Sequence, residues 1–168
     1  WHGGGHDAAT RAALAALPVG ATAPAIKTTV ALNGNDTAFD LAATLKKGPV
    51  VLYFFPAAFT QGCTLEARAF AEATADFNKA GATVVGLTGG NIDRINEFSK
   101  VECRDKFAVG AANADIIKNY DVANATRAGF TGRVSYVIAK NGKIAAVHND
   151  PKWEEHVSTS LAAVKALK

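Results

Sequence analysis

The chain has 168 residues, of which 49% are hydrophobic and 20% are charged, and its formal net charge is +3. That length suits a single domain, and the apolar content supports a buried core and argues against disorder. No block of like charges favours nucleic-acid binding, and no apolar stretch approaches the roughly 18 residues of a membrane span. We therefore expect a globular domain with no nucleic-acid partner and no membrane partner.

The N-terminal segment predicts little folded structure. Trp1-His-Gly-Gly-Gly-His6 is typical of a linker or a tag remnant, and Asp7 can cap a short helix behind it. We expect residues 1–18 to form a flexible N-terminal segment and residues 19–168 to form one domain. The chain shows no export signal to read, and its two cysteines leave the compartment open between a bacterial cytoplasm and periplasm.

Hydrophobic patterns predict strands alternating with helices along the rest of the chain. In chain order, the first half predicts a hairpin over 26–39, a helix at 41–47, a buried strand at 50–55, a helix over about 60–80 and a strand at 82–87. A helix follows whose inward face carries Ile92, Ile95, Phe98 and Ser99, and then a short strand at 107–109 and a short helix at 115–120. The chain ends with a hairpin over 134–147 and a last helix that has Trp153, Val157, Leu161 and Val164 on one stripe. This order predicts an α/β fold with a central mixed β-sheet flanked by helices and an N-terminal β-hairpin extension.

One stretch of this pattern carries chemistry. The apolar strand ends at Pro56, and the following helix delivers Cys63 to its first turn, at the carboxyl end of a central strand. A helix N-terminus offers unpaired N–H groups and a partial positive charge, and both favour a thiolate over a thiol. Thr60 lies three residues upstream and can direct a hydroxyl toward the sulfur. The stretch therefore predicts a reactive cysteine, although a free cysteine can also be a small buried apolar residue.

Pro56-x-x-x-Thr60-x-x-Cys63 resembles the active-site pattern of the peroxiredoxins, with the Phe-Phe pair before Pro56 and Cys63-Thr-Leu-Glu66 resembling the bacterioferritin comigratory protein or peroxiredoxin Q subfamily. The likeness runs from about Val19 to the chain end. It implies a thioredoxin-like fold, which the order of the elements also matches. It implies that Cys63 attacks a peroxide, that Thr60 hydrogen-bonds the peroxide, and that the Pro56 ring shields the sulfur.

The resemblance also implies roles for two charged residues. An arginine is expected just before the first strand of the hairpin over 134–147, where Gly132-Arg133 precedes Tyr136. An always-charged guanidinium stabilises both the thiolate and the charge that develops on the peroxide oxygens. Glu66 matches the family and is a supporting residue that either favours the helix dipole or holds Arg133.

Cys103 is the candidate resolving cysteine. Many relatives in the resembled subfamily carry the resolver five residues after the attacking cysteine, where this chain has Arg68, whereas others place it in the helix after the second strand. Cys103 ends that helix and lies on its inward face, which suits a buried structural cysteine equally well. His148 and His156 have no visible partner in the sequence, and we expect both at the surface.

The resulting prediction is a thiol-dependent peroxidase, with no metal, haem, flavin or other cofactor. Its implied partners are a hydroperoxide substrate and a reductant, either thioredoxin or a small thiol, and it is expected to be a monomer or homodimer. Two alternatives stay open: a thioredoxin-like disulfide reductase, against which the missing Cys-x-x-Cys argues, and a non-catalytic binding or holdase module.

Overall fold

The buried strand predicted before Pro56 is β3 (Val50–Phe55), and every one of its six residues is buried. Branched and aromatic side chains fill both of its faces, as suits a strand covered on two sides. In this computed structural model, which describes residues 16–167, β3 pairs in parallel with β4 and antiparallel with β6. The predicted N-terminal linker and most of the short helix after Asp7 lie outside the described residues.

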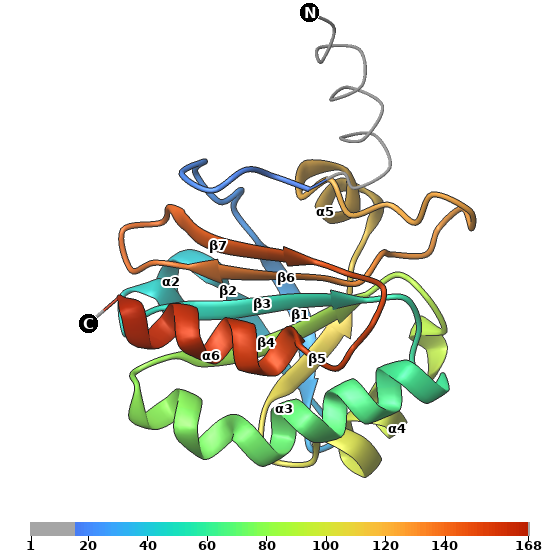
Figure 1. Cartoon of the computed structure of the whole chain (residues 1–168). Helices are drawn as coiled ribbons and strands as arrows, with labels where there is room; N and C mark the ends of the chain where they lie inside the picture. Colours follow the sequence, from blue (N-terminus) through green and yellow to red (C-terminus); the bar gives the residue numbers. More distant parts are fainter. Residues whose placement is uncertain (1–15, 168) are drawn as a thin grey trace, which may run out of the picture.

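Seven strands form one mixed sheet in the order β2-β1-β5-β4-β3-β6-β7, with helices on both faces (Figure 1). The elements are β1 (Lys27–Leu32), β2 (Asn35–Asp40), α2 (Leu41–Leu45), β3, α3 (Gln61–Lys79), β4 (Thr83–Thr88), η1 (Ile92–Arg94), α4 (Ile95–Phe98), η2 (Ser99–Cys103), β5 (Ala108–Ala111), α5 (Ala114–Asn119), β6 (Val134–Ile138), β7 (Ile144–Asn149) and α6 (His156–Ala166). This arrangement confirms the predicted thioredoxin-like fold with its N-terminal hairpin, β1–β2.

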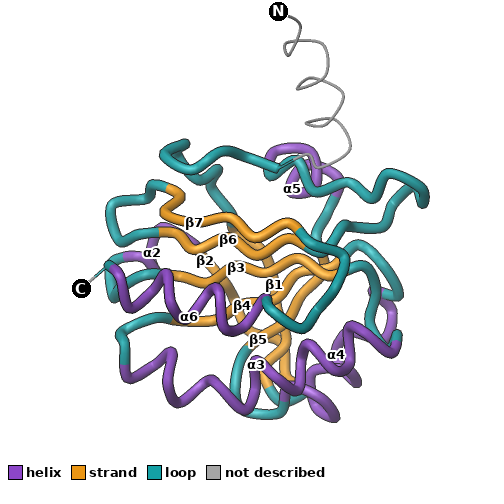
Figure 2. The backbone as a smooth tube through the Cα atoms, viewed as in Figure 1, coloured by secondary structure: helices purple, strands orange, loops and turns teal. Residues whose placement is uncertain are grey.

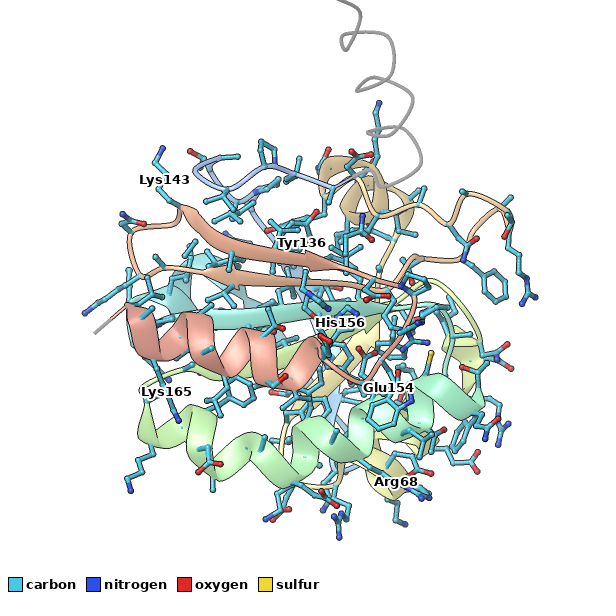
Figure 3. All side chains as sticks on the ribbon, viewed as in Figure 1. Arg68, Tyr136, Lys143, Glu154, His156 and Lys165 are labelled. Carbon is cyan, nitrogen blue, oxygen red and sulfur yellow. The ribbon has the colours of Figure 1, made fainter. Side chains whose placement is uncertain are left out.

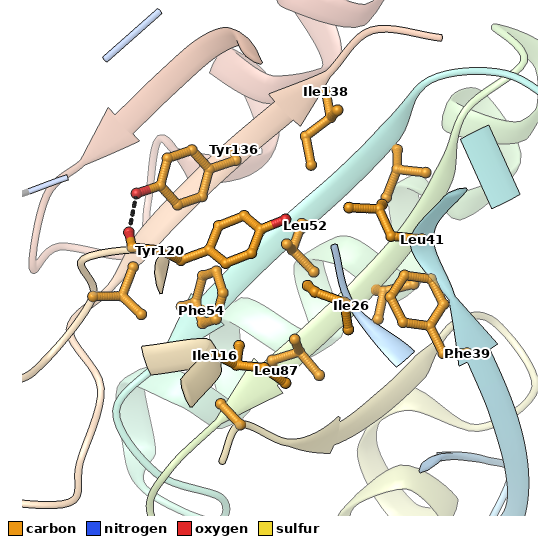
Figure 4. Close-up of a cluster of buried hydrophobic side chains, with 14 of the residues drawn as sticks. Ile26, Phe39, Leu41, Leu52, Phe54, Leu87, Ile116, Tyr120, Tyr136 and Ile138 are labelled. Atoms are coloured by element: carbon orange, nitrogen blue, oxygen red, sulfur yellow. Dashed lines mark hydrogen bonds between the residues drawn. The ribbon is translucent and has the colours of Figure 1, made fainter. Parts of the chain in front are cut away.

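Two hydrophobic clusters lie on opposite faces of the sheet. Alternate residues of β3 supply both, because successive side chains of a strand point to opposite faces: Leu52 and Phe54 join one cluster, and Tyr53 and Phe55 join the other. Figure 4 shows the first cluster, in which the Tyr136 hydroxyl donates a hydrogen bond of 2.6 Å to the Tyr120 carbonyl oxygen. The second cluster lies beneath α3, α4 and α6 and contains both cysteines.

The segment after β4 differs from the single helix that the sequence predicted. It consists of the 3₁₀ turn η1, one turn of α-helix and the π-helical turn η2. The change of helix type shifts the inward face, so Ile95 and Phe98 are buried as predicted but Ile92 is 48% exposed, and its predicted inward orientation is wrong. The last helix also begins later than predicted, at His156, which leaves Trp153 in the preceding loop.

The register of the central strands brings the start of β6, the end of β3 and the end of β7 to the same end of the strands, which we call one edge of the sheet. Val134, the first residue of β6, pairs with Phe54 near the end of β3 and with Asn149 at the end of β7. The loops that follow β3 and β7 therefore lie at the same edge (Figure 2). The carboxyl ends of strands in such a sheet are the usual place for a site. None of the helices described within residues 16–167 is long and apolar enough to cross a bilayer.

Candidate active site

The loop after β3 places Cys63 at the third position of α3, a helix of 19 residues. Thr60 is the extended residue before the first turn, yet its hydroxyl does not cap the helix. Instead, the hydroxyl donates a hydrogen bond of 3.1 Å to the Ala57 carbonyl oxygen. The first N–H groups of a helix have no intrahelical partner, so those of α3 remain without a side-chain cap beside the Cys63 sulfur.

The turn after β4 holds this loop in position. The Ala58 N–H donates to the Gly90 carbonyl oxygen at 3.1 Å, and the Asn91 side chain donates to the Ala58 carbonyl oxygen at 2.9 Å. Phe59 takes a left-handed backbone conformation with a φ of 60°. A side chain on Gly90 would overlap the Pro56 carbonyl oxygen, so the two loops meet closely only because this residue is glycine.

Arg133 reaches Cys63 from the residue that precedes β6. Its Nη2 atom lies 3.4 Å from the Cys63 sulfur, and its Nη1 atom donates a hydrogen bond of 2.7 Å to Glu66 Oε1. Its Nε atom donates to the Pro151 carbonyl oxygen at 2.9 Å. Burial alone would lower the pKa of Arg133, but the Glu66 and Cys63 groups raise it above its ordinary value, so the guanidinium keeps its charge. The structure thus brings Arg133, which the family resemblance singled out, into contact with Cys63, and its role in catalysis stays a prediction.

Gly62 leaves the room that the guanidinium occupies. A Cβ atom on this residue would lie 3.1 Å from Arg133 Nη2 and 3.9 Å from a ring carbon of Trp153. The first distance is tighter than ordinary van der Waals contact, so a larger residue would push the guanidinium away from the start of α3. The absent side chain thus lets Arg133 approach the helix at the turn that carries Cys63.

Glu66 is fully buried one turn along α3 from Cys63. Its Oε1 atom accepts the hydrogen bond from Arg133, whereas its Oε2 atom has no hydrogen-bond partner. Burial raises the pKa of this carboxyl from 4.5 to about 7, and the charge and hydrogen bond of Arg133 lower it by less. The carboxyl therefore titrates near neutrality, and its unpartnered oxygen faces His156 Nδ1 at 3.7 Å.

His156 is fully buried at the start of α6, so the prediction of a surface histidine is wrong (Figure 3). Its Nε2 atom lies 2.7 Å from the Asp150 carbonyl oxygen, and its Nδ1 atom lies 2.7 Å from Ser135 Oγ. A carbonyl oxygen only accepts, so Nε2 carries the proton, and Nδ1 of the neutral ring accepts from the Ser135 hydroxyl. Burial, with a smaller opposing contribution from the Asp150 hydrogen bond, lowers the pKa of His156 to about 4, so the ring is neutral at pH 7.

His148 is only half-buried, so its predicted surface position is wrong in part. Its ring contacts that of His156 edge to face, with centroids 4.5 Å apart, and its Nε2 atom is buried without a hydrogen-bond partner. The two histidines meet because Ser135, the partner of His156, pairs with His148 across β6 and β7. No pattern in the sequence alone signals this contact, since it depends on the register of two strands and on where α6 begins.

Cys103 is fully buried at the end of η2 and, like Cys63, carries a free thiol. Burial, together with the nearby Glu102 carboxylate, raises the pKa of the Cys103 thiol well above its ordinary value. Glu102 is held by Arg68 of α3, whose Nε atom donates a hydrogen bond of 2.8 Å to the carboxylate. Arg68 thus ties α3 to the segment that carries Cys103.

Within residues 16–167 no cluster of three or more histidine, cysteine or acidic side chains is arranged to hold a metal ion. The chemistry that the site can perform is thiol chemistry, because a cysteine lies at a helix N-terminus in contact with a buried arginine.

A thioredoxin-like sheet with such a cysteine after its central strand defines a class of thiol-dependent oxidoreductases. The AhpC/TSA family matches this chain over residues 19–147, so the chain belongs to the AhpC/TSA family of peroxiredoxins.

Similar proteins agree with this assignment. The chain is 34% identical over 124 residues to a chloroplastic peroxiredoxin Q of Sedum lineare and 33% identical over 117 residues to that of Arabidopsis thaliana. The alignments cover 73% and 69% of this chain but only 67% and 54% of those relatives.

Solved structures show the same fold. Peroxidoxin BcpB from Mycobacterium tuberculosis superposes with a TM-score of 0.80 at 25% identity, covering 90% of this chain and 99% of that one. The reduced 2-Cys peroxiredoxin of Plasmodium vivax has a TM-score of 0.75 at 20% identity, covering 89% and 95%.

Proposed function

We propose that this chain reduces hydroperoxides with Cys63 as the attacking nucleophile. The observation that carries the proposal is the contact between Arg133 Nη2 and the Cys63 sulfur at 3.4 Å, in the first turn of α3. A fixed positive charge and a helix N-terminus both stabilise the thiolate, which is the reactive form. Figure 1 shows that α3 begins close to the end of β3.

In the first step the Cys63 thiolate attacks the terminal oxygen of the hydroperoxide. The S–O bond forms as the O–O bond breaks, which yields a sulfenic acid and an alkoxide that takes up a proton to leave as an alcohol or as water. Arg133 and the uncapped N–H groups of α3 stabilise the negative charge that develops on the leaving oxygen. The Thr60 hydroxyl, which donates its proton to the Ala57 carbonyl oxygen, accepts a hydrogen bond from the peroxide O–H, and the Pro56 ring shields the sulfur from water.

In the second step the sulfenic acid condenses with a thiol, forming a disulfide and releasing water. That thiol is Cys103 or an external one, and a thioredoxin or a small thiol then restores the reduced enzyme. The deep burial of Cys103 and its raised pKa favour the external thiol unless η2 opens. The proposed substrates are hydrogen peroxide and organic hydroperoxides, and the proposed reaction uses no cofactor.

Intact mass after one equivalent of peroxide tests the proposal. We expect either a gain of one oxygen, which indicates a stable sulfenic acid, or a loss of two hydrogens, which indicates a disulfide with Cys103. Cys63→Ser, which removes the thiolate while keeping nearly the same shape, should show neither change. An unchanged mass in the wild-type protein, or peroxide turnover in the Cys63→Ser variant, contradicts the proposed function.

A further inference from the structure

His156, which was predicted to lie at the surface, is connected to Arg133 along two paths. The first path runs through Glu66. Its Oε1 atom is bonded to Arg133, and its other oxygen, fully buried and without a hydrogen-bond partner, lies 3.7 Å from His156 Nδ1. The imidazole therefore packs against the carboxyl oxygen that Arg133 does not bind, and it limits how far the Glu66 side chain can move.

The second path runs through the loop between β7 and α6. His156 Nε2 donates to the Asp150 carbonyl oxygen at 2.7 Å. The Asp150 N–H donates to the Arg133 carbonyl oxygen at 3.3 Å, and the next carbonyl oxygen, that of Pro151, accepts from Arg133 Nε at 2.9 Å. Two consecutive loop residues are thus held between the histidine on one side and the arginine on the other.

Ser135 gives the ring one orientation. Its hydroxyl lies 2.7 Å from Nδ1 and is itself buried on β6, two residues after Arg133. With Nδ1 bonded to the strand and Nε2 bonded to the loop, the imidazole cannot rotate without breaking a buried hydrogen bond. Leaving a buried polar group without its partner is costly, so the ring is rigid where it touches Glu66 and Asp150.

From this geometry we propose that His156 is a positioning residue of the peroxide site, which holds the Arg133 guanidinium against the Cys63 sulfur through Glu66 and through the Asp150–Pro151 backbone. The inference rests on the proposed function for its consequence in catalysis, but the positioning itself concerns the resting enzyme. His156 touches neither the sulfur nor a substrate and acts only through Arg133.

The groups that face the ring are consistent with this role. Glu66 approaches from α3, Arg133 from the residue before β6 and His148 from β7, and Asp150 contributes its carbonyl oxygen from the loop. Burial keeps the imidazole neutral near pH 7, and a neutral ring adds no charge that would repel Arg133. The effect of His156 on Cys63 is therefore geometric rather than electrostatic.

The test measures how readily the Cys63 thiolate forms when no peroxide is present. Reduced protein is alkylated with iodoacetamide over a range of pH, and modification of Cys63 is followed by peptide mass. His156→Phe keeps a planar ring but removes both nitrogens, so Arg133 should loosen and the alkylation profile should move to higher pH. The rate of peroxide reduction should fall by about tenfold, as expected for a small displacement of a catalytic group. His156→Gln, which can donate to Asp150 and accept from Ser135, should restore much of both.

The matched control is Val164→Ala, a cavity-forming change in the same helix, at a fully buried residue away from the site. It should lower the melting temperature and leave the alkylation profile of Cys63 unchanged. If His156→Phe lowers the melting temperature as Val164→Ala does and also leaves the profile unchanged, His156 is merely structural and the inference is wrong.

If His156→Phe does not fold, ¹⁵N NMR of the imidazole nitrogens in the folded wild-type protein and in two other variants tests the inference. The His156 ring signals should change in Arg133→Lys, which cannot keep all three guanidinium contacts, and should stay unchanged in Cys103→Ser. Unchanged signals in both variants overturn the inference. Because alkylation and NMR need no peroxide, wild-type protein that failed to reduce peroxide would contradict the proposed function without touching the positioning role.

Discussion

Glu66 and His156 make a prediction about how stability depends on pH. In the folded protein, burial raises the pKa of Glu66 from 4.5 to about 7 and lowers that of His156 from 6.5 to about 4. At a pH between 5 and 6, the unfolded chain therefore holds a proton on the histidine, whereas the folded chain holds one on the carboxyl. The number of bound protons is nearly the same in both states, so this pair should make the wild-type free energy of unfolding change little with pH in this window.

Each group taken alone has a large effect of opposite sign. A factor of ten in acid dissociation corresponds to about 1.4 kcal/mol, so each shift corresponds to roughly 3 kcal/mol. Glu66 has its pKa raised, so its contribution is present below pH 4.5 and is lost as the pH rises to about 7. His156 has its pKa lowered, so its contribution is present above pH 6.5 and is lost as the pH falls to about 4.

Removing Glu66 or His156 should reveal how the other residue makes the free energy of unfolding depend on pH. In Glu66→Gln the histidine titrates alone, so the free energy of unfolding, relative to wild type, should rise with pH by up to about 3 kcal/mol across the window from pH 4.5 to 7. In His156→Phe the relative free energy should fall with pH by a similar amount, between about pH 4 and 6.5. Subtracting the wild-type curve cancels the titration of every other group.

Urea unfolding at constant ionic strength, repeated at closely spaced pH values, measures these curves. The result that refutes the reasoning is a pair of variants whose curves run parallel to wild type, shifted but with no difference in slope. Curves that differ from wild type in the same direction would also contradict it, since the two shifts have opposite signs.

Three further predictions concern the cysteines and their neighbours. Arg133→Ala should slow peroxide attack by about 10²-fold, because a charge-assisted contact in a partly dry site is lost, and stopped-flow kinetics indistinguishable from wild type would mean that another group supplies the charge. Gly62→Ala should displace the same guanidinium and lower the rate in the same direction with little change in melting temperature; an unchanged rate would show that the site tolerates the added methyl group. Arg68→Ala should loosen the segment that ends at Cys103, raising its hydrogen exchange and the yield of disulfide after peroxide. In that variant, unaltered exchange with no gain in disulfide would argue that the ion pair does not hold η2 closed.

The part of the site that could be predicted is the part that lies close together in sequence. Pro56, Thr60 and Cys63 occupy one strand-to-helix connection, so local pattern alone places them at the start of α3. Arg133 was expected only because the resembled family carries an arginine at the start of this strand, and the pairing of Phe54 with the next residue, Val134, accounts for why that position lies beside the cysteine. Local pattern therefore locates the first three residues, whereas Arg133 and the roles of all four come from the family resemblance and stay predictions.

His156 could not be predicted, for a physical reason. A lone histidine in a polar stretch resembles a surface residue, and its partners Ser135 and Asp150 become neighbours only when β6, β7 and α6 have packed. The predicted inward orientation of Ile92 was wrong for a different reason. Helical periodicity assumes one type of helix, whereas the segment passes through 3₁₀, α and π turns within a few residues. Both errors arise where tertiary packing overrides a local pattern.

The site is built from the start of α3, from Arg133 and from the loop after β7, which the ribosome makes at different times. Arg133 is 70 residues beyond the cysteine it contacts, and the loop that holds its guanidinium follows later still. Because synthesis proceeds from the N-terminus, the nascent chain exposes Cys63 long before its arginine exists. A fragment that ends before β6 would contain the whole Pro-Thr-Cys motif and yet lack the site. Fast reaction of Cys63 with peroxide should therefore appear only after β6 and the loop that follows β7 have packed, so it would report on a late step of folding.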